Sequence, residues 1–173
     1  MQTFKKREDI PTALTWDLES IFSRNDDWER DFLALQGRIP ELEALKDTLT
    51  HSGEALLTVL RKRDDLYEEV ETLYAYASMR KDEDTTNGLY QGMADRITQL
   101  VVRISTAAAY IEPEILALSQ ETLDRFLQET PGLDLYGQQL HDLNRKRPHV
   151  RSAEVEAVLA ATGEVTDAPD SIF

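Results

Sequence analysis

The first candidates for metal ligands in this chain are its three histidines, His51, His141 and His149. A catalytic zinc ion is commonly held by two histidines four residues apart on one helix face, with an intervening glutamate that takes a proton from the metal-bound water. None of the three stands in a His-Glu-x-x-His pattern. Pro148 lies between His141 and His149, so a shared helix face is not expected there. We predict capping or surface roles for all three.

The acidic run around Asp82, Asp84 and Thr86 imitates the start of a calcium-binding loop. In such a loop an invariant glycine and a bidentate glutamate follow at fixed positions. Asn87 stands in place of the glycine and Met93 in place of the glutamate. We therefore expect these residues to form caps and corner hydrogen bonds, and no calcium site.

Other chemical patterns are equally weak. The neighbouring acids Glu68 and Glu69, and Glu112 and Glu114, carry no catalytic signal in a chain with 33 Asp and Glu residues. The chain has no cysteine, which excludes disulfides and thiolate chemistry. It has neither a glycine-rich phosphate loop nor a serine nucleophile motif. We predict no catalytic, cofactor-binding or metal-binding residue in this chain.

Five tyrosines gather in the middle of the sequence: Tyr67, Tyr74, Tyr76, Tyr90 and Tyr110. Tyrosine offers both apolar area and a hydroxyl group, so the cluster could form a wall that contacts a peptide. Packing in the core is the alternative, and we favour it. Tyr74 and Tyr76 cannot face the same way on a helix, so at least one of them is expected near a surface.

The charge of the chain excludes several partners. Its formal net charge is −14, which repels phosphates and makes nucleic acid and anionic membranes poor partners. The basic triplets Lys5–Arg7, Arg61–Arg63 and Arg145–Arg147 are expected to be solvated. No apolar core follows the first basic residues, and no apolar stretch approaches the ~20 residues that span a bilayer. We expect a cytoplasmic protein.

Spacings of three and four between apolar residues predict two long helices around a polar corner, within residues 66–118. The first helix carries its apolar face at Leu66, Val70, Leu73, Tyr74 and Ala77, and the second at Leu89, Met93, Ile97, Leu100, Ile104, Ala108, Ile111 and Ile115. Asn87-Gly88 is the expected point of reversal. The chain is therefore predicted to be organised around an antiparallel helical hairpin.

Shorter elements are expected before the hairpin. Met1–Thr15 is expected to be an extended leader, because Pro11 disfavours an early helix. Asp17–Phe22 is expected to form a helical turn. That turn would anchor the leader through Trp16, Leu18, Ile21 and Phe22. Cap-type residues at 23–26 precede a helix that continues past Gly37 or breaks near Pro40. Ser52 would then cap a separate helix at 55–63.

Three more helices are expected after the hairpin. Ser119 would cap residues 121–128, with Leu123, Phe126 and Leu127 facing inward. The apolar residues Leu135, Leu140 and Leu143 suggest another helix at 133–146. Ser152 would cap residues 153–161, with Gly163 as the stop. The prediction is an all-α bundle of six to eight helices, forming a single lobe over residues 1–173.

A known family shares several of these features. The tyrosine-rich helix end that runs into Asp82–Asn87, and the long helix that ends in AAAYIEPEIL, resemble the N-terminal region of the oligoendopeptidase F family of zinc oligopeptidases. Thr15–Leu18 is similar to the family's opening Trp-Asp-Leu, and Asp27-Trp28 to the start of its first long helix. The segment Arg145–Ala160 is similar to its Arg-rich, Pro-His segment. These motifs cover nearly the whole chain in order.

This resemblance implies a function that the residues alone do not. It implies a zinc endopeptidase acting on short oligopeptides, whose His-Glu-x-x-His helix and further glutamate would lie in a C-terminal catalytic domain absent from this chain. We expect Phe173 to be a boundary within a longer polypeptide. The lobe would wall the substrate channel and restrict access, with the catalytic domain and peptides as its partners. The alternative is a free-standing helical module that binds a peptide or protein in a groove.

Overall fold

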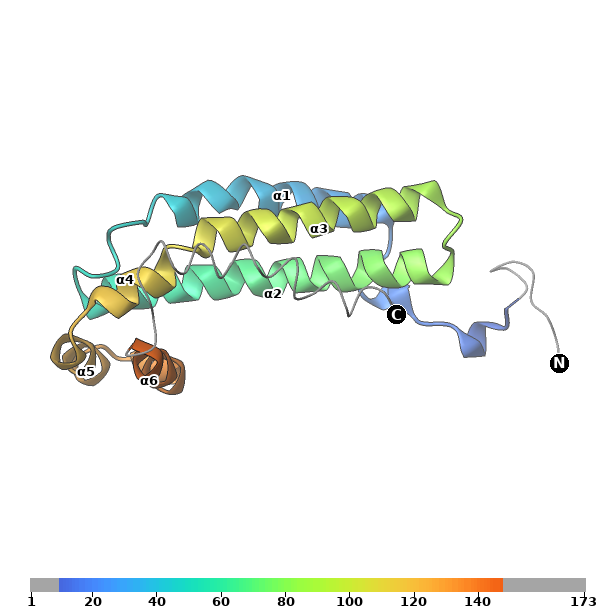
Figure 1. Ribbon diagram of the computed structural model, residues 1–173. Coiled ribbons are helices and arrows are strands. Elements are labelled where there is room, and N and C mark those ends of the chain that lie inside the picture. Colours follow the sequence, from blue (N-terminus) through green and yellow to red (C-terminus); the bar gives the residue numbers. More distant parts are fainter. Residues whose placement is uncertain (1–9, 148–173) are drawn as a thin grey trace, which may run out of the picture. The chain divides into compact units, whose positions relative to one another are not determined.

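The computed structural model describes residues 10–147, and all regular structure in this part of the chain is helical (Figure 1). It comprises six α-helices and three 3-10 helices, and none of these is both long and apolar enough to cross a membrane. The predicted all-α class is confirmed. Two compact units divide the chain between Ala117 and Leu118. That residues 1–173 act as one lobe stays a prediction.

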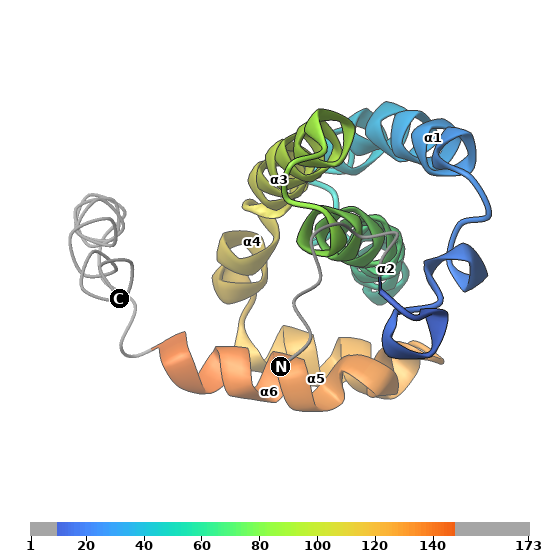
Figure 2. The ribbon, with the colours of Figure 1, turned by 90° about the vertical axis from the view of Figure 1, so that its right-hand side faces the viewer.

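Three long helices build the first unit: α1 (Asn25–Glu43), α2 (Gly53–Glu83) and α3 (Gly88–Ala108). Figures 1 and 2 show them side by side from two directions, and α2 packs against both of the others. Their facing stripes are buried and include Trp28, Leu35, Ile39, Leu66, Val70, Leu73, Met93, Ile97, Leu100 and Ile104. Removing these apolar side chains from water is the main driving force for the bundle.

α2 is one continuous helix of 31 residues, which corresponds to a length of about 46 Å. The Ser52 hydroxyl accepts a hydrogen bond from the Ala55 N–H at 3.1 Å, so the predicted cap is confirmed. The separate helix predicted at residues 55–63 is wrong. Residues 63–66 contain neither glycine nor proline, so nothing interrupts the helix between its buried residues in the range Leu56–Leu60 and those from Leu66 onward.

The hairpin of α2 and α3 is confirmed, with a small correction at its corner. The Asn87 N–H donates to the Asp84 carbonyl oxygen at 3.1 Å, which closes a turn. The side-chain oxygen of Asn87 accepts from the Leu89 N–H at 3.0 Å and caps α3. The reversal therefore occupies residues 84–87, and Gly88 is already the first residue of α3.

The second long helix of the prediction is divided. α3 ends at Ala108, and α4 (Ile111–Ala117) begins after a turn at Ala109 and Tyr110. Pro113 explains the break, because a proline ring inside a helix clashes with the carbonyl four residues earlier, here that of Ala109. The apolar periodicity continues through the break, and Ile111 and Ile115 are buried as expected.

Some residues assigned to the buried stripes are not buried. Tyr74 and Leu89 are exposed and Ala108 is only partly covered, while Tyr76 and Ala107 are buried instead. An apolar residue can recur after either three or four positions, so the sequence leaves open which of two nearby residues lies on the buried face. The position of the neighbouring helix decides which one is covered.

Residues 10–22, which we call the strap, precede α1. They contain two 3-10 helices, η2 (Thr12–Leu14) and η3 (Leu18–Ser20), so the prediction that the leader is extended is wrong at η2. Pro11 directly precedes η2, a place where its missing N–H costs nothing. Leu18 is buried and Phe22 partly buried, as expected of anchors.

The other two expected anchors, Trp16 and Ile21, are exposed, so that part of the prediction is wrong. α1 begins after Arg24, whose side chain forms no cap, instead of with a capping Ser, Asn or Asp. The helix then runs through Gly37 and Pro40 and ends at Glu43, so it does not break at the proline.

The second unit contains α5 (Gln120–Glu129), η4 (Leu133–Tyr136) and α6 (Gly137–Lys146). Ser119 caps α5 by accepting from the Thr122 N–H at 3.1 Å, as predicted. Gly132 has a φ of 90°, a left-handed conformation that separates α5 from η4.

One helix was predicted at residues 133–146, and the structure divides it into η4 and α6. Leu140 and Leu143 are buried as expected, but Leu135 lies on the exposed side of η4. A 3-10 helix turns faster than an α-helix, so extrapolating the α-helical period misplaces Leu135. The predicted helix at 153–161, with Ser152 and Gly163, lies outside the described residues.

The packing of α3 gives a direct test. Ile97→Ala is expected to lower the free energy of unfolding by about 2–5 kcal/mol, because Ile97 is 0% exposed and its removal leaves a cavity. Val102→Ala is the matched control in the same helix; it is 60% exposed and should change stability by less than about 0.5 kcal/mol. Urea unfolding followed by circular dichroism measures both. Equal losses would contradict the assigned buried face.

Candidate functional site

The histidines do not come together in a metal site. His51 and His141 are exposed, and His149 lies outside the described residues. Between residues 10 and 147, no three His, Cys, Asp or Glu side chains are grouped so that they could hold a metal ion. This part of the chain therefore does not fit a zinc site.

The acidic corner forms the local hydrogen bonds that were predicted for it. One carboxylate oxygen of Asp84 accepts from the Thr86 N–H at 3.1 Å and from the Thr86 hydroxyl at 2.7 Å. With Asn87 capping α3, the side chains that imitate a calcium loop serve the turn itself.

Two of the neighbouring acids have structural partners. Glu69 pairs with Arg38 across the interface of α2 and α1. Glu114 accepts a hydrogen bond from the Asp47 N–H at 2.8 Å. Asp47 has a φ of 65°, and among the residues that the structure describes no other non-glycine residue has a positive φ. The carboxylate of Glu114 therefore stabilises a strained turn between α1 and α2.

The tyrosines divide between core and surface. Tyr76 is fully buried and Tyr74 exposed, which confirms that the two face different ways. The Tyr110 hydroxyl donates to the Leu42 carbonyl oxygen at 2.9 Å and ties the start of α4 to the end of α1. The Tyr67 hydroxyl lies 3.3 Å from that of Ser105 across the hairpin. Most of these contacts support the packing role.

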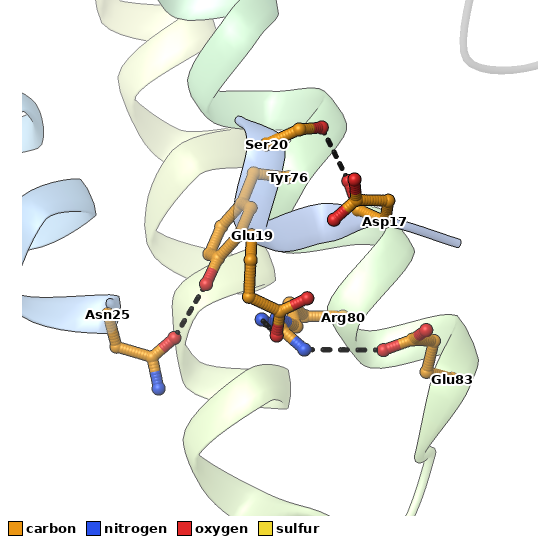
Figure 3. A network of polar contacts seen from close by, with 7 residues as sticks. All are labelled: Asp17, Glu19, Ser20, Asn25, Tyr76, Arg80 and Glu83. Atoms are coloured by element: carbon orange, nitrogen blue, oxygen red, sulfur yellow. Dashed lines mark hydrogen bonds and ion pairs between the residues drawn. The ribbon is translucent and has the colours of Figure 1, made fainter. Parts of the chain in front are cut away.

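Arg80, near the end of α2, is the centre of a polar network that the sequence did not reveal (Figure 3). Its guanidinium donates to Glu19 of the strap at 2.8 Å and contacts Glu83 at 3.4 Å. It also lies 5.1 Å from the ring centroid of Tyr76 and 5.9 Å from that of Tyr90. Such cation–π contacts add to the ion pairs.

Tyr76 extends this network to α1. Its hydroxyl donates to the side-chain oxygen of Asn25 at 3.0 Å, and the ring of Phe22 meets its edge with centroids 5.2 Å apart. Burial alone would lower the pKa of Arg80, but its hydrogen bonds to Glu19 and Tyr76 raise that pKa above its usual range. Arg80 is therefore a permanent cation that joins the strap to the hairpin.

A second arginine, Arg96, joins α3 to α1. It donates two hydrogen bonds of 2.7 Å to the carboxylate of Glu29, and its guanidinium lies 4.3 Å from the ring centroid of Phe32. The hydrogen bond from Arg96 lowers the pKa of Glu29. Glu29 and Arg96 are 67 residues apart, so no local pattern could have paired them.

A cleft of about 440 Å³ lies between α1 and α2. Phe22 and Leu73 supply its apolar lining, and its polar lining comes from Asp31, Arg38, Asp65, Glu68, Glu69 and Thr72. Carboxylates predominate, and Glu69 is paired with Arg38. The lining of the cleft thus combines apolar area with a net negative charge.

Comparison with known proteins places this chain in a family. A family model described as Oligopeptidase F matches residues 114–173. Oligopeptidase PepF of Bacillus subtilis (strain 168) is 36% identical over 167 residues, which make up 96% of this chain and 25% of that protein. The plasmid-encoded oligoendopeptidase F of Lactococcus lactis subsp. cremoris is 35% identical over 173 residues, 98% of this chain and 28% of that protein.

The chain corresponds to the N-terminal domain of the oligoendopeptidase F family. The resemblance drawn from its motifs is thereby confirmed. The crystal structure of oligoendopeptidase-F from Enterococcus faecium agrees, with a TM-score of 0.69 and 32% identity over 83% of this chain and 28% of that one. The chain thus spans about a quarter of the length of its curated oligoendopeptidase F relatives.

The contact of Tyr110 predicts a pH dependence. Burial raises the pKa of the Tyr110 phenol to about 12, and the nearby Glu114 carboxylate adds to this effect. The unfolded phenol ionises near pH ~10, so the folded state binds the extra proton between these values and loses stability as the pH rises through them.

Tyr110→Phe removes this ionisation together with the hydrogen bond to Leu42. Its destabilisation relative to the unmodified chain should therefore be largest below pH ~10 and shrink toward pH ~12. Urea unfolding at a series of pH values measures the difference. A difference in the free energy of unfolding that stays constant over this range would mean that folding does not raise the pKa of Tyr110.

Proposed function

We propose that this chain is the N-terminal helical lobe of a zinc metalloendopeptidase that hydrolyses short oligopeptides. The lobe walls the substrate channel and restricts access to it, without catalytic residues of its own. The observation that carries the proposal is the coverage: relatives named oligopeptidases match nearly all of this chain, while the chain spans only about a quarter of them. Most of each relative therefore remains to supply the chemistry.

We assign the zinc ion to the part of the protein that follows this N-terminal quarter. The described residues do not fit a metal site, and none of the three histidines of the chain stands in a His-Glu-x-x-His pattern. When bound, the zinc ion would polarise the peptide carbonyl and activate water in the catalytic domain. The residues of this chain would act by enclosure, because an enclosed channel has room for a short, flexible peptide and not for a folded protein or a long chain.

A rigid wall is what the geometry supports. Three packed helices are joined by the pairs Arg96–Glu29 and Arg38–Glu69 and by the hydrogen bond from the Trp28 indole N–H to the Leu73 carbonyl oxygen at 2.9 Å. Ties between all three helices resist separation of the bundle. The acidic cleft between α1 and α2 gives this wall a negatively charged face.

The reading frame beyond codon 173 gives the first test. It is expected to encode a His-Glu-x-x-His motif followed by a further glutamate, because zinc needs these ligands and the general base between them. DNA sequencing of the source locus decides this. A stop codon directly after codon 173 would instead favour a free-standing interaction module.

A chimaera tests the role of the lobe. In the Lactococcus oligoendopeptidase F, residues 1–173 would replace the matching N-terminal quarter, and a form lacking that quarter is the control. The chimaera is expected to cleave a short fluorogenic peptide and to spare a long unfolded protein, while the control loses this discrimination. The 173-residue chain alone should cleave neither.

Circular dichroism verifies that the chimaera and the control are folded before their rates are compared. Equal discrimination between short and long substrates by both forms would show that the lobe does not restrict access. Chelator-sensitive cleavage by the 173-residue chain alone would show that it carries an active site.

A further inference from the structure

The strap, residues 10–22, is attached to the hairpin mainly through its second half. Leu18 is 1% exposed, and the Phe22 and Tyr76 rings are in T-shaped contact. Glu19, between them in sequence, accepts the hydrogen bond from Arg80 at 2.8 Å. Leu18, Glu19 and Phe22 thus attach this segment to α2.

The first half of the strap is less covered. Leu14 and Trp16 are exposed, and the Leu14 and Thr15 N–H groups donate within the strap, to Pro11 and Thr12. These hydrogen bonds are local, so they do not attach the first half of the strap to the hairpin. Segments with few buried contacts open at a lower free energy than a packed core.

Arg80 is the group on which this attachment depends. Its side chain is 15% exposed and that of Glu83 is 8% exposed, so their charges are poorly solvated. The Nε atom of Arg80 is buried and has no hydrogen-bond partner among the described residues. Removing Glu19 from such a cation costs more than breaking a fully exposed pair.

The attachment also closes part of the cleft. Phe22 is one of the residues that line the cleft between α1 and α2, next to Leu73 from α2. The same ring covers an edge of Tyr76, which is fully buried. If the strap lifts, the cleft loses this wall and Tyr76 becomes accessible.

We propose that the strap is a movable cover, held shut by the Glu19–Arg80 ion pair, that opens independently of the three-helix core. Opening separates Glu19 from Arg80, withdraws Leu18 and Phe22, and exposes Tyr76 at the wall of the acidic cleft. The strap thereby regulates how much of this cleft another chain can reach.

Thiol labelling tests the opening, because the chain has no cysteine of its own. Leu18→Cys places a thiol on the buried side of the strap. Leu66→Cys places one on the buried side of α2, at a position that is also 1% exposed. Each labelling rate is divided by the rate of the same variant in denaturant. Leu18→Cys is expected to react at least about tenfold faster than Leu66→Cys, since local opening needs less free energy than global unfolding.

Arg80→Gln tests the role of the ion pair. Added to Leu18→Cys, it should raise the labelling rate by up to about fivefold, because the Glu19 side chain is 63% exposed and solvent weakens the ion pair. The rate of Leu66→Cys should change far less. Arg96→Gln is the matched control: it removes another arginine–carboxylate pair between helices without touching the strap, and should leave the rate of Leu18→Cys unchanged.

Amide hydrogen exchange checks the result without a core substitution. The Ile21 and Phe22 N–H groups donate to the Leu18 carbonyl oxygen and close the single turn of η3. We expect this turn to lose its order when Leu18 leaves α2, so that exchange of these two amides reports on opening. In the cysteine-free chain, Arg80→Gln should accelerate their exchange by a similar factor. The proposal is overturned if these amides exchange only with the core of α2, or if Arg80→Gln accelerates them no more than Arg96→Gln does.

Discussion

The burial of α2 between α1 and α3 is the constraint on which the first unit depends. Most of the stability of a helix within a protein comes from tertiary packing of its apolar face, and less from the intrinsic helix propensity of its residues. α2 packs against both neighbours, and residues such as Leu66, Val70 and Leu73 lose nearly all their exposure. Both connections of α2 follow from this requirement. The connection from α1 and the hairpin corner before α3 each reverse the chain, so that α1 and α3 run back along α2.

Polar contacts fix details that apolar packing leaves open. Arg96 sets the position of α3 against α1, Tyr110 holds the start of α4 at the end of α1, and Arg80 attaches the strap to the hairpin. Each joins segments far apart in the sequence. Apolar stripes can slide along one another at modest cost, whereas a guanidinium–carboxylate pair has a defined geometry. These contacts therefore specify the alignment of the helices more than they add to their stability.

The chain corresponds to the N-terminal domain of the oligoendopeptidase F family, and its structure gives packing and turn roles to several acids and to most of the tyrosines. The acidic cleft and the strap meet at α2, because Phe22 of the strap lines the cleft together with Leu73 of α2. Apolar packing and negative charge are therefore combined at this place in the first unit.

The sequence by itself determined the all-α class, the helical hairpin, the caps at Ser52 and Ser119 and the family. These depend on local signals, namely apolar spacing, side chains that hydrogen-bond nearby N–H groups, and motif order. Only the tertiary structure decided that α2 is continuous from Gly53, that Tyr76 is buried and Tyr74 exposed, and that Arg80 and Arg96 find their carboxylates. The reason is physical: the period of a helix identifies a face only to within a residue or two. The partners of a long charged side chain depend on which helices pack beside it.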